Sequence, residues 1–246
     1  MGRDPRWAAL TLDEVGEHAA RGAVVILPVG ATEQHGPHLV TGTDSLFAER
    51  VAVTSASQTG DVVLPTLPYG CSLGHTDRWP GTLSLHPATL TAVVVKLGNW
   101  VYRSGFRKLV ILNSHATNGP PCQSAILQLR HELPSLRLRF ISTFDLSGAI
   151  TARYLEDAED PHANEAETSL MLHLHPGGVR EDRVVDEPDR TEGRVLQYPM
   201  PAVSSSGVVG APSGATAERG EELFAMHVDA FARLLERARE ETDPAL

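Results

Sequence analysis

Residues 23–29 read AVVILPV, an apolar and β-branched run that ends directly before the polar segment GATEQH of residues 30–35. A short, continuous apolar run bounded by turn residues is typical of a strand that is covered on both faces. Three further runs have the same character: VVLPTL at 62–67, KLVILNS at 108–114 and LRLRFIST at 136–143. The sequence therefore predicts four buried strands.

Helical periodicity fills the intervals between and after these strands, at residues 43–57, 87–104, 119–132, 163–174 and 215–240. Strands that alternate with helices require right-handed crossovers, and these produce a mainly parallel sheet with helices on both sides. Residues 176–213 are rich in Pro, Gly and Ser and predict a loop with room for one edge strand. Since no linker divides the chain, we expect one α/β domain over residues 1–246.

The composition excludes several classes of protein. Lys and Arg number 21 against 31 Asp and Glu, a net charge of −10, which argues against a nucleic-acid partner because phosphate binding needs clustered cations. The N-terminal segment MGRDPRWAALTLDE has no signal-peptide core, and no apolar stretch is long enough to span a bilayer. We expect a cytoplasmic protein with no membrane partner.

Polar clusters follow two of the predicted strands, where ligands bind in parallel sheets. Glu33 and His35 follow the first strand, Asp44 comes nine residues later, and His115 follows the third strand between Asn113 and Asn118. A mixed set of carboxylates and imidazoles suits a transition metal such as Zn or Mn. The alternative is that Glu33 and His35 are exposed loop residues, that Asp44 caps a helix and that His115 is structural.

A further cluster, EDPHANEAETSLMLHLHP at residues 159–176, places His162 at the start of a helix and Glu165 and Glu167 in its first turns. Acidic residues are also common there because the helix dipole favours them. If Glu167 converges with Glu33 and Asp44, cations are needed to offset the mutual repulsion of the carboxylates.

A carboxylate shared by two metals, of which Asp44 is the best candidate, would set the ions roughly 3.5–4 Å apart. Water between them would lose a proton near neutral pH and attack an amide carbonyl. His162 is the candidate to carry a proton to the leaving nitrogen. Its alternative role is to cap its helix.

One rival motif is GCSLG at residues 70–74, which matches the Gly-x-Ser-x-Gly nucleophile elbow with Ser72 as nucleophile. The elbow requires a helix directly after the serine, whereas HTDRWPG at 75–81 predicts a turn. We therefore assign this segment to a substrate pocket, with Trp79 as an apolar wall and Asp77 or Arg78 in reach of substrate. Trp79 can equally be core filling.

Five segments resemble the creatininase family of metal-dependent amidohydrolases, in the family's order and along nearly the whole chain: LPVGATEQHGPHLVTGTD (27–44), WPGTLSL (79–85), NSHATN (113–118), HANEAETSLML (162–172) and SGVVGAPSGATAERG (206–220). The resemblance implies a three-layer α/β/α sandwich with a mainly parallel sheet. It also implies a small-molecule amide substrate, two divalent ions per chain, Zn or Mn with Fe also possible, and a homo-oligomer, often a hexamer.

Carried over by position, the resemblance implies that the metal ligands are Glu33, His35, Asp44, His115 and Glu167, with Asp44 as the bridge. His162 matches the histidine placed over the metals. His75 lies where many members have a Glu-His pair, so it joins Asp77, Arg78 and Trp79 as a predicted substrate contact.

Departures from the family pattern bear on the substrate. Members that act on creatinine carry a metal-binding glutamate where this chain has Thr117 and a tryptophan where it has Ala158, so a creatininase proper is not expected. Asn164 replaces a usual glycine, which Asn tolerates if the position is left-handed. The alternatives are a peptidase acting on a small redox-peptide precursor and a non-catalytic metal-binding member.

Overall fold

The structure, a computed structural model, describes residues 4–244. Its sheet has the strand order β2-β1-β3-β4, and every neighbouring pair is parallel. The strands are β1 (Val25–Val29), β2 (Val62–Val63), β3 (Lys108–Asn113) and β4 (Arg137–Ser142). The prediction of a mainly parallel sheet is confirmed.

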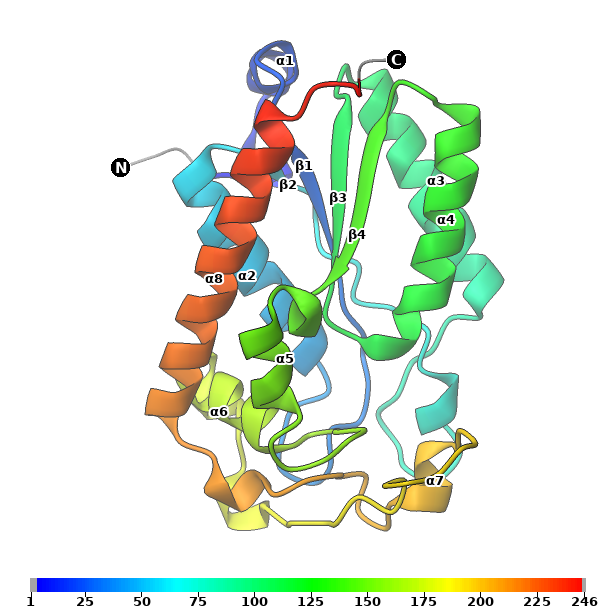
Figure 1. Cartoon of the computed structure of the whole chain (residues 1–246), viewed down its shortest axis with the longest axis vertical. Helices are drawn as coiled ribbons and strands as arrows, with labels where there is room; N and C mark the ends of the chain where they lie inside the picture. Colours follow the sequence, from blue (N-terminus) through cyan, green and yellow to red (C-terminus); the bar gives the residue numbers. More distant parts are fainter. Residues whose placement is uncertain (1–3, 245–246) are drawn as a thin grey trace.

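Helices cover both faces of this sheet (Figure 1). The four long helices are α2 (Thr43–Thr59) and α8 (Ala217–Glu240) on one face, and α3 (Pro87–Arg103) and α4 (Gly119–Glu132) on the other. The shorter helices are α1 (Leu12–Ala20), α5 (Gly148–Tyr154), α6 (Glu165–Leu174) and α7 (Met200–Val203). The fold is thus the predicted three-layer sandwich, although the sequence did not predict α1, α5 or α7.

Alternation along the strands divides the core into two layers, because successive side chains of a strand point to opposite faces. Leu27 and Ile111 pack with α3 and α4, whereas Ile26 and Val110 pack with α2 and α8. All four side chains are almost fully buried. The continuous apolar runs are therefore explained by coverage on both faces.

The chain order creates a switch point between β1 and β3. From β1 the chain passes through α2 to β2 at one edge, and it then returns through α3 to β3 on the other side of β1. The connections after β1 and β3 thus leave the sheet in opposite directions. In open α/β sheets a ligand crevice forms at this point, beyond the carboxyl ends of the strands. Helices α5, α6 and α7 lie around that end (Figure 1).

Three predicted segments differ from the structure. The strand predicted at 136–143 is not buried throughout, because β4 lies at the edge of the sheet and its Arg137 and Arg139 are exposed. The predicted strand 62–67 is regular only at Val62–Val63, because Pro65 has no N–H to donate; Leu67 resumes the pairing as a single bridge to Val29. Residues 176–213 form no strand. Their pairing is limited to isolated bridges, of which Glu187 with Gly210 is one, together with α7 and short 3-10 turns.

No helix within residues 4–244 is long and apolar enough to cross a membrane.

Helices α6 and α8 approach each other closely at Gly220. A Cβ on Gly220 of α8 would lie 1.9 Å from the backbone oxygen of Ser169 in α6. Only glycine fits there, since no side-chain rotation can relieve a clash with backbone.

We therefore predict that Gly220→Ala lowers the free energy of unfolding by about 1–3 kcal/mol, the usual range for overpacking. The measurement is the midpoint of urea unfolding followed by circular dichroism. Gly16→Ala is the matched control, because Gly16 lies inside α1 with nothing within 4 Å of its added Cβ; it is expected to be neutral or stabilising. Equal midpoints for Gly220→Ala and wild type would contradict this packing.

Candidate metal centre

The predicted ligands come together at the switch point. Glu33 and His35 follow β1, Asp44 opens α2, and His115 follows β3, so all lie beyond the carboxyl ends of the two central strands. Their exposed fractions are 0%, 1%, 3% and 6%. The alternative that Glu33 and His35 are exposed loop residues is therefore wrong. Charged side chains that are buried in this way require partners.

Glu167 of α6 completes the cluster. Two sets of side chains each offer ligand atoms within 4.8 Å of one another: Glu33, Asp44 and His115 form one, and His35, Asp44 and Glu167 form the other. Asp44 belongs to both sets, so one carboxylate stands between two potential ion sites. A third set joins Glu33 and His35 to His162.

Polar atoms of these side chains lack hydrogen-bond partners although they are buried. Both carboxylate oxygens of Glu33, Nε2 of His35 and Oδ2 of Asp44 are in this state. Imidazole nitrogens do lie close, with His115 Nε2 3.2 Å from Glu33 Oε2 and His35 Nε2 3.3 Å from Asp44 Oδ1, but without hydrogen-bond geometry. Buried atoms left this way are costly. The donor set therefore fits divalent cations, which would satisfy these atoms together.

The protein groups shift one another's protonation. Burial disfavours charge on His35, but Asp44 overcomes it and raises the pKa of His35 to about 10. At His115 burial also disfavours the charged form, but Glu33 and Asp44 outweigh it and raise the pKa of His115 to about 9. Burial and neighbouring Asp44 raise the pKa of Glu167 to about 7, although His35 opposes the shift. Protons on His35, His115 and Glu167 thus reduce the net negative charge of the cluster. A bound cation would displace these protons.

The amides of Asn113 and Asn118 flank His115 but do not hold its imidazole. The Asn113 side chain donates to the backbone oxygen of His115 at 2.8 Å, and that of Asn118 donates to the backbone oxygen of Gly30 at 3.0 Å. The imidazole Nε2 instead lies 3.1 Å from Ser72 Oγ and 2.7 Å from Thr117 Oγ1. Ser72 and Thr117 are therefore contacts that the sequence did not reveal, and their hydroxyls orient the ring.

The start of α6 is strained so that Glu167 faces the cluster. The left-handed residue is Ala163, with φ of 51°, and not Asn164, which is extended and caps α6 by accepting from the Glu167 N–H at 3.2 Å. The N–H of Ala163 donates to Glu167 Oε2 at 2.7 Å. Such strain persists only where surrounding contacts impose it.

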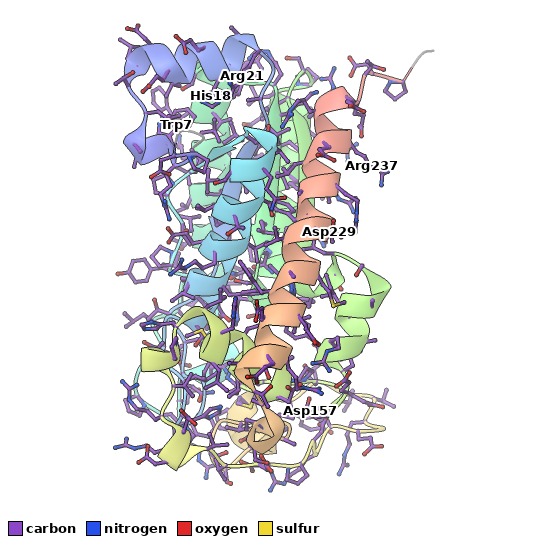
Figure 2. The ribbon with its side chains drawn as sticks, turned by 90° about the vertical axis from the view of Figure 1, so that its left-hand side faces the viewer. Trp7, His18, Arg21, Asp157, Asp229 and Arg237 are labelled. Carbon is purple, nitrogen blue, oxygen red and sulfur yellow. The ribbon has the colours of Figure 1, made fainter. Side chains whose placement is uncertain are left out.

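Asp157 supplies such contacts at the lower end of the molecule (Figure 2). Its carboxylate accepts from Asn164 Nδ2 at 2.7 Å, from the N–H of Glu165 at 3.0 Å and from the N–H of Ala211 at 2.7 Å. The Glu165 side chain binds Arg219 of α8 at 2.7 Å instead of the metal cluster. Residue 165 is thus structural, and residue 167 faces the site.

His162 contacts the cluster through one ring nitrogen. Its Nε2 donates to the backbone oxygen of Gln34 at 2.9 Å, and the Gln34 side-chain nitrogen lies 3.1 Å from the same atom. Nδ1 is left facing Glu33 Oε1 at 3.7 Å. The Gln34 side chain fits only because Gly207 has no Cβ, which would lie 2.1 Å from Gln34 Oε1. No signal in the sequence pointed to this role of Gln34.

Of the four predicted substrate contacts, His75 lies in the cluster. Its Nδ1 is 3.1 Å from Glu33 Oε1, and its ring centroid is 4.6 Å from that of His162. Arg78 donates to the backbone oxygens of Pro201 and Ser204 and lies over the half-buried Trp79. Asp77 is exposed and accepts from Thr76. For all four residues the substrate role stays a prediction.

Ser72 does not sit on a nucleophile elbow. The nearest preceding strand ends at Val63, and only the 3-10 turn Leu73–His75 follows.

His38, which had no predicted role in the site, is buried with its Nε2 2.9 Å from Thr168 Oγ1 and belongs to none of the three sets found in residues 4–244.

Comparison with known proteins agrees with this geometry. The profile of the creatininase family, described as creatinine amidohydrolase, matches residues 8–235. A mycofactocin precursor peptide peptidase from Mycolicibacterium smegmatis is 34% identical over 224 residues, 87% of this chain and 85% of the relative. A creatinine amidohydrolase from Pseudomonas putida is 32% identical over 249 residues, 92% of each chain.

Solved creatininases have the same fold. A mutant creatininase of Zn-Zn type matches 98% of this chain and 100% of its own, with a TM-score of 0.87 and 30% identity. A manganese creatininase matches 97% of this chain and 100% of its own, with a TM-score of 0.86 and 30% identity. The chain therefore belongs to the creatininase family, and it is a hydrolase that acts on C–N bonds.

Proposed function

We propose that the protein is a two-metal amidohydrolase that cleaves the C–N amide bond of a small cyclic amide or formamide. The observation that carries this proposal is the sharing of Asp44 between two sets of buried ligand atoms. Glu33 and His115 would hold one ion with Asp44, and His35 and Glu167 would hold the other. The Zn-Zn and manganese forms of its structural relatives support Zn or Mn, with Fe as a further candidate.

Such ions, when bound, would polarise an amide carbonyl and lower the pKa of water. The chain's own residues supply the proton transfer and the positioning. His162 turns Nδ1 toward the cluster because the backbone of Gln34 holds Nε2. Nδ1 is thus the atom that would carry a proton to the leaving nitrogen, and His75 lies beside it to contact the substrate.

A peptidase is the second candidate function. A relative at 34% identity is named a mycofactocin precursor peptide peptidase, and Thr117 and Ala158 depart from the pattern of members that act on creatinine. A non-catalytic metal-binding protein is the third candidate. We also propose a cytoplasmic homo-oligomer, with a hexamer favoured by the family resemblance.

A substrate screen tests the proposal. The purified protein, loaded with Zn or Mn, is incubated with lactams, hydantoin-like rings, formamides and short peptides, and release of amine or carboxylate is measured. Turnover of a ring or formamide supports the amidohydrolase, and turnover of peptides alone supports the peptidase. Stoichiometric metal without turnover of any of these would favour the non-catalytic alternative.

We predict that His115→Ala abolishes turnover and the binding of the ion that His115 would hold with Glu33 and Asp44, because it removes one of that ion's three ligands. Metal per chain is measured by plasma emission spectrometry after dialysis, and wild type is expected to hold two ions. His86→Ala is the control, since His86 is exposed at the start of α3. Fewer than about one tightly bound ion in wild type, without activation by Zn or Mn, would sink the two-metal proposal.

We predict that His162→Ala retains both ions and loses turnover by about 10²–10⁴-fold, the range for removal of a general acid-base group. Metal content and kcat are measured on the same preparation. Loss of metal from this variant would instead make His162 a ligand, with Glu33 and His35. Full activity would exclude the proton-transfer role.

Ser72→Ala tests nucleophilic catalysis by serine, which deserves a direct test because Ser72, His115 and Asp44 lie in contact as a hydrolytic triad would. We expect kcat to stay within a few-fold of wild type, because Ser72 only orients His115. A fall of several orders of magnitude with metal content unchanged would favour the serine mechanism.

A further inference from the structure

A small cavity lies behind the metal cluster, on the side of α5 and α6. Its volume is about 20 Å³, and its polar lining comes from Thr43, Asp44, Ser114, Thr143, Tyr154 and Glu167. A cavity needs roughly 10–15 Å³ and two to four polar partners to hold one water molecule. Size and lining therefore suit a single water.

The two carboxylates that line the cavity have unused hydrogen-bonding capacity. Asp44 is buried, and its Oδ2 has no hydrogen-bond partner. One oxygen of Glu167 accepts from the N–H of Ala163, which leaves the rest of that carboxylate for other partners. A carboxylate oxygen has two lone pairs, so it can bind an ion and accept a hydrogen bond at once.

Tyr154 and Thr143 supply the hydroxyl groups. Tyr154 is 7% exposed at the end of α5, and Thr143 is 1% exposed directly after β4. The ring of Tyr154 packs edge-on against Phe144 and His227. This packing fixes the direction of the hydroxyl, which at neutral pH still carries its proton and can donate it.

We propose that a buried water in this cavity links the Tyr154 hydroxyl to the carboxylates of Asp44 and Glu167, and that Tyr154 is thereby a positioning residue for the metal ligands. The water accepts from Tyr154 and donates to the two carboxylates, which gives it about three hydrogen bonds, the usual number for a buried water. Thr143 is the fourth polar neighbour. The inference rests on the proposed metal site and extends it.

The ion held by His35, Asp44 and Glu167 depends most on this arrangement, because two of its three ligands share the water. Partners behind metal ligands commonly change affinity by about 10–100-fold when they are removed. Tyr154→Phe removes the hydroxyl and keeps the packed ring. We expect it to weaken the more sensitive ion 10–100-fold and to leave the other within a few-fold.

The test titrates Zn and Mn into wild-type and variant protein against a chromophoric chelator. Tyr102→Phe is the matched control: its hydroxyl is 3.0 Å from Ser135 Oγ, at the end of α3 remote from the cluster. Thr143→Val is a second variant, with a smaller expected loss. The unfolding temperature is measured for each, so that a folding defect is not mistaken for lost affinity.

A high-resolution crystal structure of the wild type provides a readout that does not require metal. An ordered water within hydrogen-bond distance of Tyr154 Oη and of Asp44 or Glu167 supports the inference, and a dry cavity overturns it. Unchanged affinity in Tyr154→Phe, or a loss equal to that of Tyr102→Phe, also overturns it. If the wild type binds no metal, the proposed function fails, and the crystallographic water still decides the present inference.

Discussion

The repulsion among three carboxylates at one end of the sheet, with Glu33 and Asp44 buried and Glu167 half-buried, is the constraint on which the rest of the structure depends. Glu33, Asp44 and Glu167 follow β1, open α2 and lie in α6, and each shares a set of close ligand atoms with His35. Such a group is stable only with compensating positive charge. Without metal, protons on His35 and His115 supply this charge, and bound divalent cations would replace those protons. The surrounding fold holds these charges in place.

The sheet and α6 contribute to the site in different ways. The ends of β1 and β3 are fixed by backbone pairing and by apolar coverage on both faces, so Glu33, His35 and His115 are placed by the most rigid part of the molecule. Glu167 and His162 are placed by loop contacts instead: the Asp157 carboxylate, the strained Ala163 and the side chain of Gln34.

The sequence predicted the strands and long helices because continuous apolar runs and helical periodicity are local signals. Helix α1 was missed although Thr11 and Glu14 form a capping box, a signal that the sequence does contain. The convergence of Glu33, His35 and His115 was predictable from their positions after strands, whereas Glu167 was expected from the family resemblance. The role of Gln34 was not, because its partners His162 and Gly207 lie more than a hundred residues away. The left-handed backbone of Ala163 was not predictable, because it depends on a contact with Glu167 that only the folded chain creates.

The close contact at Gly220 has a consequence for how the site assembles. Helix α6 carries Glu167, and it lies against the first turn of α8, which the chain reaches only after residue 216. The candidate ligands that follow β1 and β3 would therefore meet before α8 has docked, whereas the placement of Glu167 would depend on α8. Metal binding would then follow an order set by folding, because the ion nearest Glu167 would bind only after α8 has docked.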